Sequence, residues 1–421
     1  MERFMNFIQD KLVPPLVKIG NQRHLMAVRN GLSITIPFII IGSLFLIIGN
    51  LPFEWWGKFI GDFGPKLNAP VNVTFGALSL IASAGIGYSL AKEYKLDPIS
   101  GGIIALIGFL LTQVNEKYEL MIDNFGSTGL FTAIIVSLIA IEILKLFVKK
   151  NLVIKLPDGV PPAIANSFAA LLPGGAVLLV VWLIRVVMGF DITEFLALVF
   201  SPLVFALNTL PGMLILVLFI CLLWTVGVHG DAVLGSIAGP IFLQYLTANT
   251  EAYINHQPIP YITAEGFNTM FVCMGGTGVT MALVLLCLRS KSKVYKSFAK
   301  LAFPSSIFEI SEPVVFGFPI VFNPLMFIPF IVTPLVLTTI TYFLMYFDII
   351  GRPVAMVPWT MPPIIGPFLL TGGDWKAAVW SVLALGIAVV IYYPFFKAAE
   401  KQQLLLEKNE ELSVGKSEVS L

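Results

Sequence analysis

Long apolar runs alternate with short polar segments along most of the chain, and each run is close to the length that crosses a lipid bilayer. A spanning helix needs about 20 mostly apolar residues. The run at 232–247 is shorter and less uniform, and the run at 192–209 is interrupted by Pro202, which is typical of a surface helix or a broken span. The clear spans that the pattern predicts are 31–50, 72–91, 98–114, 129–148, 171–190, 211–228, 267–288, 325–347 and 374–396.

The composition agrees with a membrane protein. Of the 421 residues, 57% are hydrophobic and 12% are charged, whereas soluble domains carry about 25% charged residues. This balance excludes a soluble enzyme and a disordered protein, and a net charge of +1 gives no field that would recruit a nucleic acid. Cys221, Cys273 and Cys287 lack the spacing of a metal site or a disulfide framework. We therefore predict an all-α integral membrane protein with about ten transmembrane helices.

The distribution of charge predicts the direction of threading, because loops rich in lysine and arginine stay in the cytoplasm. The segments 145–155 and 289–300 are strongly basic, which places them inside. The loops 51–70, 115–128 and 248–266 have acidic or mixed charge, which places them outside.

Both ends of the chain are expected in the cytoplasm. Residues 1–30 mix basic and apolar residues in the manner of an interfacial amphipathic helix, not of a removable signal peptide. The charged residues 401–421 predict a cytoplasmic tail that begins as a helix and ends in disorder. With 232–247 counted as a span, the threading is consistent with this placement of both termini.

Two apolar stretches, 303–324 and 351–374, are too rich in proline to form regular spans. Irregular backbone at membrane depth survives only where it is buried in protein or lines a wet cavity, and in transporters such interruptions point to the substrate site. We predict that both stretches are re-entrant hairpins or broken helices. The two hairpins of the fold are expected near 232–247 and 303–324.

The composition also divides the chain in two. Residues 1–165 contain uninterrupted spans and form an N-terminal scaffold, whose five-span half extends to about 190. Residues 166–400 contain most of the prolines and ionisable groups at membrane depth, and we predict that they carry the substrate site.

Three ionisable residues are candidates for chemistry. His229 follows an apolar run in WTVGVHGD, and either caps a helix end or faces a ligand. Glu309 and Glu312 lie in IFEISEPVVFG, where a carboxylate needs hydroxyl donors such as those of a sugar. The alternative for each carboxylate is a tether to backbone amides or to a lysine. We favour the functional role more strongly for Glu312 than for Glu309.

Aromatic rings supply the second part of a sugar site, because the C–H face of a pyranose packs against a flat ring. Trp224 and Trp359 lie beside the irregular segments. The sequence MGGTGVT at 274–280 places glycines in a span, which allows either close helix packing or a backbone that faces a ligand. No nucleotide-binding motif or ATPase domain is found, so the chain does not drive transport with its own hydrolysis of nucleotide.

Several segments resemble the membrane IIC component of the phosphoenolpyruvate-dependent sugar phosphotransferase system, in its lactose, cellobiose and N,N′-diacetylchitobiose branch. The resemblance covers essentially the whole chain. The segments that carry it are FIQDKLVPPLVKIGNQRHLMAVRNGLSITIPFIIIGSLFLI, LPDGVPPAIANSF, WTVGVHGD, GGTGVTMAL, FEISEPVVFGFPIVFNP and Trp359-Thr360-Met361-Pro362-Pro363.

This resemblance implies a homodimer in the bacterial plasma membrane, with ten spans, two re-entrant hairpins and amphipathic helices on the cytoplasmic side. The first half would form the dimer interface and the second half the transport domain. His229 and Glu312 would contact the sugar near the hydroxyl that receives phosphate, and Trp359 would pack on a ring. Thr277 and Asn323 would add hydrogen bonds.

The resemblance also implies the reaction and its partners. The chain would carry a β-linked disaccharide of the diacetylchitobiose or cellobiose type inward and present its 6-hydroxyl for phosphorylation. The donor, a cysteinyl phosphate, would lie on a separate IIB protein that is served by IIA, and no cofactor is expected. Either Glu312 or His229 could act as the base. The competing hypotheses are an ion-coupled sugar symporter and a sugar sensor without transport.

Overall fold

The computed structural model describes residues 10–11, 13–51, 54–157, 159–318, 320–321 and 323–418. Parts of three predicted segments therefore lie outside the described residues. They are the beginning of the amphipathic segment, Pro319 and Phe322 of the hairpin, and the last residues of the tail. Helices are the regular elements of the described residues, whose β-type pairing is limited to an isolated bridge between Val114 and Leu120. The prediction of an all-α protein is confirmed.

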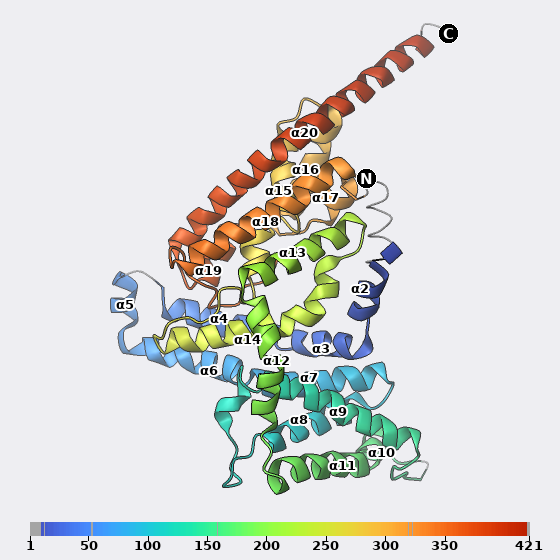
Figure 1. The fold of residues 1–421 in the computed structure, drawn as a ribbon, viewed down its shortest axis with the longest axis vertical. Coiled ribbons are helices and arrows are strands. Elements are labelled where there is room, and N and C mark those ends of the chain that lie inside the picture. Colours follow the sequence, from blue (N-terminus) through green and yellow to red (C-terminus); the bar gives the residue numbers. More distant parts are fainter. Residues whose placement is uncertain are drawn as a thin grey trace.

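The helices of the N-terminal part pack in the lower half of Figure 1, with α7 crossing the molecule above α8, α9 and α11. Glycines allow close approach at these contacts, since a Cβ on Gly31 of α3 or Gly85 of α7 would overlap the backbone of the other helix. The helices are α2 (Val13–Gly20), α3 (Arg23–Ser33), α4 (Ile36–Gly49), α5 (Glu54–Ile60), α6 (Asn68–Gly76), α7 (Leu78–Glu93), α8 (Pro98–Thr112), α9 (Leu130–Lys149), α10 (Pro162–Ala169) and α11 (Leu171–Trp182).

Most helices of the C-terminal part lie in the upper half of Figure 1, whereas α14 extends down to α3 and α6. Helix α12 runs between the two parts, from α11 to α13. The long last helix, α20, crosses this half diagonally and ends at the top of the view. The helices are α12 (Ile192–Leu207), α13 (Leu210–Thr225), α14 (Gly230–Ile254), α15 (Thr280–Leu288), α16 (Lys293–Ile307), α17 (Glu312–Gly317), α18 (Pro324–Tyr346), α19 (Ile365–Leu370) and α20 (Trp375–Glu418).

Within the described residues, six helical segments are long and apolar enough to cross a membrane, and a seventh is obtained if the bent pair α12 and α13 counts as one span. These two helices meet at 76°, which agrees with the predicted break near 192–209. Other predicted spans are short or broken, as in α8, which has 15 residues. The chain is thus a multi-pass helical membrane protein.

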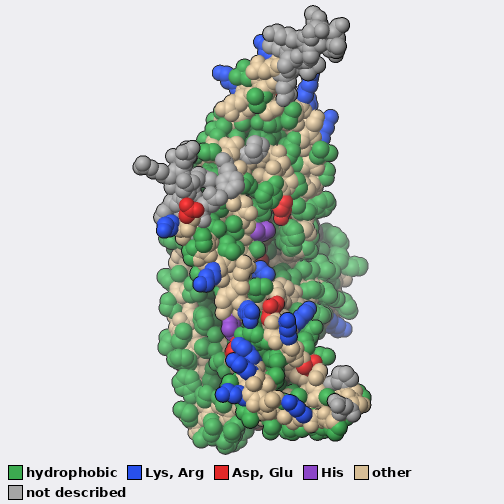
Figure 2. Space-filling view, turned by 90° about the vertical axis from the view of Figure 1, so that its right-hand side faces the viewer, with side chains coloured by type: hydrophobic (Ala, Val, Ile, Leu, Met, Phe, Trp, Pro, Cys, Tyr) green, Lys and Arg blue, Asp and Glu red, His purple; other side chains and the backbone are tan. Residues whose placement is uncertain are grey.

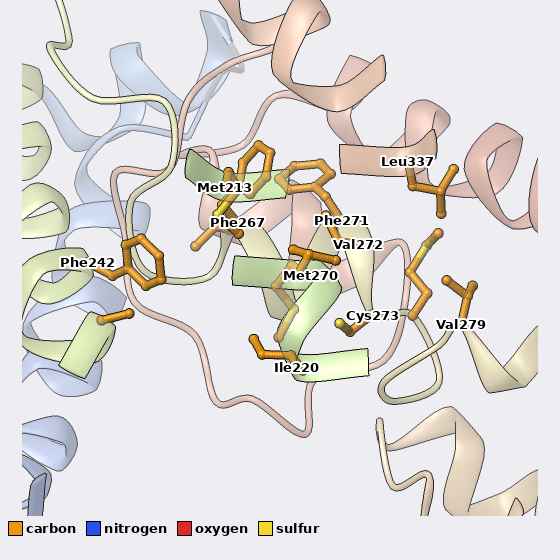
Figure 3. Packing of buried hydrophobic residues seen from close by; sticks show 14 of the residues in the cluster. Met213, Ile220, Phe242, Phe267, Met270, Phe271, Val272, Cys273, Val279 and Leu337 are labelled. Carbon is orange, nitrogen blue, oxygen red and sulfur yellow. The ribbon is translucent and has the colours of Figure 1, made fainter. Parts of the chain in front are cut away.

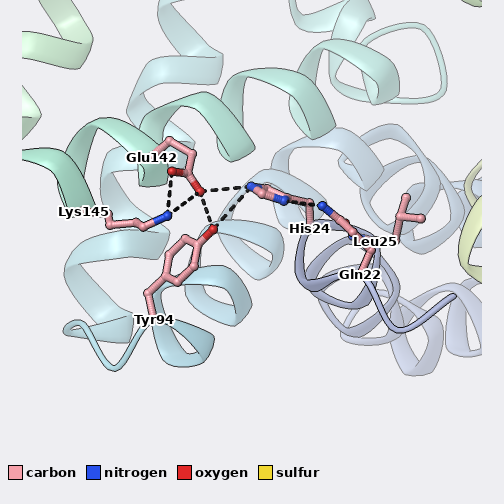
Figure 4. Close-up of polar contacts among 6 residues, drawn as sticks. All are labelled: Gln22, His24, Leu25, Tyr94, Glu142 and Lys145. Carbon is pink, nitrogen blue, oxygen red and sulfur yellow. Dashed lines mark hydrogen bonds and ion pairs between the residues drawn. The ribbon is translucent and has the colours of Figure 1, made fainter. Parts of the chain in front are cut away.

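A polar cluster ties the helices of the N-terminal part together (Figure 4). The carboxylate of Glu142 on α9 accepts hydrogen bonds from His24 Nε2 of α3 at 3.0 Å, from Lys145 Nζ at 2.9 Å and from the hydroxyl of Tyr94. The Lys145 ammonium also lies 3.9 Å from the centre of the Tyr94 ring. Because each donor satisfies the same carboxylate, the cluster fixes α3 and the end of α7 against α9.

Two sequence predictions differ from the structure. The stretch 232–247, predicted as a hairpin or weak span, lies within one continuous helix, α14, which accommodates Pro240 without a break. The stretch 267–288, predicted as a regular span, is interrupted between a short helical turn at Asn268–Val272 and α15. The prediction for the two proline-rich stretches agrees with the structure, because the helical structure is interrupted within both 303–324 and 351–374.

The interruption at 273–279 has a direct cause in the glycines of that segment. Gly275, Gly276 and Gly278 have φ angles of 77°, 97° and 82°, and Val279 follows at 57°. These left-handed conformations are open to glycine and end a right-handed helix. We call residues 273–279 the glycine loop. It folds against a core that contains Phe267, Phe271 and Leu337, which Figure 3 shows at close range.

We predict that Gly278→Ala destabilises the protein. A Cβ at this position would overlap the ring of Phe330, which is fully buried. The alanine residue would also have to adopt the positive φ of Gly278. The expected cost is about 1–3 kcal/mol, measured as a lower midpoint of thermal unfolding in detergent. Gly175→Ala is the control, because Gly175 has nothing within 4 Å of its Cβ position. Equal stability of the two variants would contradict this account of the glycine loop.

Candidate functional site

A cavity of about 270 Å³ lies where the irregular segments of the C-terminal part converge. Its walls come from the turn between α13 and α14, from the glycine loop, from the turn between α16 and α17, and from the irregular segment before α19. The lining residues are Trp224, His229, Asp231, Thr269, Cys273, Gly276, Thr277, Glu309, Ser311, Glu312 and Trp359. Six predicted site residues, His229, Glu312, Trp359, Trp224, Thr277 and Glu309, are thereby brought together.

His229 and Glu312 face each other across this cavity. The distance from His229 Nε2 to Glu312 Oε1 is 3.9 Å, and the side chains are 50% and 48% exposed, respectively. Glu312 is the first residue of α17 and Pro313 the second. Proline is common in the first turn of a helix, where its missing N–H group costs no helical hydrogen bond. A small ligand group that enters between the two side chains can therefore contact both.

The orientation of the His229 ring is set by its own helix. His229 is the N-cap of α14, and its Nδ1 accepts a hydrogen bond from the backbone N–H of Ala232 at 3.2 Å. A neutral imidazole that accepts at Nδ1 carries its proton on Nε2. The helix-cap role and the ligand-facing role, which the sequence left as alternatives, are thus compatible. His229 presents an N–H donor toward Glu312.

Asp231, which was not among the predicted site residues, connects two of them. Its Oδ2 accepts hydrogen bonds from Trp224 Nε1 at 3.0 Å and from Thr277 Oγ1 at 2.8 Å. The Trp224 ring in turn lies 4.4 Å from the imidazole of His229, centre to centre. Asp231 stands two residues after His229 in the motif WTVGVHGD, so the signal for it was present in the sequence.

Glu309 holds the glycine loop against the turn between α16 and α17. The side chain is 8% exposed, and its Oε2 accepts the backbone N–H groups of Gly275 at 2.5 Å and Gly276 at 3.1 Å. This contact is the tether to backbone amides that the sequence offered as the alternative role. The other oxygen, Oε1, is buried without a partner among the described residues, and it belongs to a side chain that lines the cavity.

These contacts close into a ring around the cavity. Glu312 faces His229, His229 packs beside Trp224, and Trp224 and Thr277 both donate to Asp231. Thr277 belongs to the glycine loop, whose amides donate to Glu309, three residues before Glu312. A change at one member of this ring can therefore shift the others.

The remaining two predictions have different outcomes. Trp359 lies at the cavity and is 61% exposed, so its ring is available to a ligand. Asn323 does not lie among the described lining residues. It caps α18 instead, with its Oδ1 accepting the backbone N–H of Leu325 at 3.0 Å. An asparagine directly before a proline at the start of a helix is typical of a cap.

Comparison with known proteins shows which family the chain is similar to. Residues 29–334 match the family described as "Phosphotransferase system, EIIC". The cellobiose-specific EIIC component of Geobacillus stearothermophilus is 40% identical over 97% of both chains. The lichenan permease IIC component of Bacillus subtilis is 39% identical over 98% of this chain and 97% of the relative. The crystal structure of ChbC, the IIC component of the N,N′-diacetylchitobiose-specific phosphotransferase system, superposes with a TM-score of 0.90 at 37% identity, over 96% of this chain and 99% of ChbC.

We predict that Glu309→Ala destabilises the glycine loop more than Glu309→Gln. Alanine leaves the N–H groups of Gly275 and Gly276 without an acceptor, at a cost of about 1–3 kcal/mol, whereas glutamine retains one acceptor oxygen. Thermal unfolding in detergent measures the difference. If Glu309→Gln is as destabilising as Glu309→Ala, the charge and not the amide tether is what the loop requires.

Proposed function

Because the chain belongs to the EIIC family of the phosphotransferase system, we propose that its cavity binds a β-linked disaccharide and presents the 6-hydroxyl for phosphorylation. The chain is a sugar permease of this system, in the bacterial plasma membrane, and it works with IIA and IIB proteins. The relatives named for cellobiose and lichenan and the ChbC structure favour a β-linked sugar of the cellobiose or diacetylchitobiose type.

The facing pair of Glu312 and His229 is the observation that carries the proposed role of the site. A carboxylate can accept a hydroxyl proton, and an Nε2–H group can donate to the oxygen of the same hydroxyl. Because the backbone of Ala232 occupies Nδ1, His229 is held in the donor form toward the cavity. We therefore assign Glu312 as the base and His229 as the positioning donor.

The proposed step is a direct transfer of the phosphoryl group. The 6-hydroxyl oxygen of the sugar attacks the phosphorus of the cysteinyl phosphate on IIB, and the new O–P bond forms as the S–P bond breaks. The hydroxyl proton passes to Glu312, and the cysteine of IIB leaves as a thiolate. The phosphate gives the sugar close to two negative charges, so the product cannot cross the bilayer again.

We extend the proposal to the assembly and its orientation. Lysine and arginine side chains gather on the face shown in Figure 2, which includes α2 and the ends of α9 and α10, and this supports a cytoplasmic placement of that face and of both termini. The ten-span topology with two re-entrant hairpins, a homodimer formed through the N-terminal half, and a transport half that moves against it are proposed from membership of the family.

Glu312→Gln and His229→Ala are expected to abolish phosphorylation-coupled uptake while the protein remains folded. Loss of a general base lowers a rate by roughly 10²–10⁴-fold, and glutamine cannot accept the hydroxyl proton. Uptake of radiolabelled cellobiose into vesicles that contain IIA, IIB and phosphoenolpyruvate measures the effect. Glu194→Gln, on the exposed start of α12, is the matched control. Unimpaired uptake by both site variants would remove this assignment of the site.

The energy source of uptake distinguishes the proposed mechanism from an ion-coupled symporter. In the same vesicles, a protonophore is expected to leave accumulation unchanged, because phosphorylation traps the sugar. Omission of phosphoenolpyruvate is expected to stop accumulation. The reverse pattern, with accumulation lost to the protonophore and maintained without phosphoenolpyruvate, would show a symporter. Absence of counterflow of labelled sugar in liposomes would instead favour a sensor.

A further inference from the structure

Helix α16 has three different flanks. One flank is buried against the protein and consists of Tyr295, Ala299, Ala302 and Ser306. Lysines occupy the second flank, and Val294 and Leu301 occupy the third. At 3.6 residues per turn, the centres of these flanks lie roughly 120° apart around the helix. We propose that α16 lies at the boundary of the bilayer and binds the head group of an anionic phospholipid through Lys296 and Lys300.

The apolar flank of α16 is uncovered by the protein. Leu301 is 82% exposed and Val294 is 50% exposed, and because they stand seven residues apart they lie along one line of the helix. Among the described residues, α16 is not one of the helical segments that are long and apolar enough to cross a membrane. Helices that lie in the membrane interface instead bury one apolar face at the acyl boundary and keep lysines on the polar face. The flanks of α16 are divided in this way.

The lysine flank carries positive charge that nothing within the helix balances. The sequence of α16, KVYKSFAKLAFPSSI, contains no acidic residue. Lys296 and Lys300 stand four residues apart, a spacing at which like charges destabilise a helix. Both side chains are exposed, and neither forms an ion pair with another described residue. An anion that contacts both ammonium groups would relieve this repulsion.

The carboxylates that reach α16 from α20 are engaged elsewhere. Glu400 accepts the backbone N–H of Lys291 at 2.8 Å and pairs with the ammonium of Lys397 at 2.6 Å. Glu407 accepts the hydroxyl of Ser292, the N-cap of α16. These contacts hold the start of the helix in place and do not neutralise its lysine flank. The counter-charge is therefore left to a group outside the described residues.

A phospholipid supplies both parts that the two open flanks require. Its phosphate can contact the ammonium groups, while its acyl chains cover Leu301 and Val294. The basic segment 289–300 is predicted to face the cytoplasm, and the cytoplasmic leaflet attracts such segments through its anionic lipids. Inorganic phosphate would supply the charge alone and leave the apolar flank in water. The phosphorylated IIB protein also carries negative charge, but lipid covers an apolar flank in a membrane protein without any further partner.

The lipid site adjoins the helix that carries Glu312. The ring of Phe318, at the end of α17, lies 4.7 Å from the ring of Tyr295 and 6.0 Å from that of Phe298, centre to centre. A Cβ on Gly317 would lie 2.8 Å from the Phe298 ring. Because α17 packs this closely on α16, a lipid that holds α16 at the interface also supports the helix that Glu312 begins.

Quenching of tryptophan fluorescence by phospholipids with brominated acyl chains tests the site. Leu301→Trp places a reporter on the apolar flank, and subtraction of the unmodified protein removes the signal of the seven native tryptophans. The protein is reconstituted in phosphatidylcholine vesicles that contain brominated phosphatidylcholine or, at the same mole fraction, brominated phosphatidylglycerol. Leu179→Trp is the control reporter, because Leu179 is exposed on α11, which contains no lysine or arginine.

At the Leu301→Trp reporter, phosphatidylglycerol is expected to bind about fivefold or more tightly than phosphatidylcholine, since each lysine near the membrane surface favours anionic lipid by about this factor. High salt should lower this ratio. Addition of Lys296→Gln and Lys300→Gln should bring it close to one, as for Leu179→Trp. Lys401→Gln with Lys408→Gln, on the exposed end of α20, removes the same charge and should leave the ratio unchanged.

Three results would overturn the lipid site. Absence of quenching by either lipid would place the apolar flank in water, where the IIB protein is the alternative occupant. Equal quenching by the two lipids would show that the flank contacts bulk lipid without a head-group site. A ratio that survives removal of both lysines would show that other groups select the lipid. Val294→Trp is the second reporter if gel filtration shows that Leu301→Trp is not folded.

Discussion

Every backbone polar group that loses its helical partner at membrane depth needs another partner within the protein, and this constraint shapes the centre of the molecule. The glycine loop breaks a helix where the chain could have continued one. Glu309 accepts the N–H groups of Gly275 and Gly276, and this contact allows the break to persist. The same side chain brings the loop to the turn that carries Glu312. The hydrogen bonds that make irregular backbone possible therefore also assemble the cavity.

This arrangement explains why the site is preorganised. His229 has its Nδ1 occupied by a backbone amide, and Trp224 and Thr277 are fixed by one oxygen of Asp231. In the proposed mechanism, little reorientation would be needed when a sugar enters, so that the binding energy could be used to align the reacting hydroxyl. Because neighbouring members of the ring share partners, substitutions among them are not expected to act additively.

Two of the polar contacts between the N-terminal and C-terminal parts involve segments close to the candidate site. Arg29 of α3 donates to the carbonyl of Ala232, and Ser43 Oγ of α4 accepts the backbone N–H of Met356 at 2.6 Å. Ala232 follows Asp231 directly, and Met356 stands three residues before Trp359, so both contacts adjoin the lining of the cavity. In the proposed mechanism, movement of one part against the other would have to exchange these bonds for others.

The sequence by itself determined the class of the protein, because the length and uniformity of the apolar runs allow only a helical membrane protein. Proline and glutamate at membrane depth also indicated the segments that the structure brings to the candidate site. The sequence also selected His229, Glu312 and Trp359, which the structure brings to one cavity, because ionisable and aromatic residues beside broken helices at membrane depth are expensive to place without a role. It did not identify the break at 273–279, the continuity of α14 or the role of Asp231. Those features depend on which distant groups supply hydrogen-bond partners: amides of the glycine loop for Glu309, and Trp224 and Thr277 for Asp231. Only the tertiary structure brings such partners together, because no local pattern of residues specifies them.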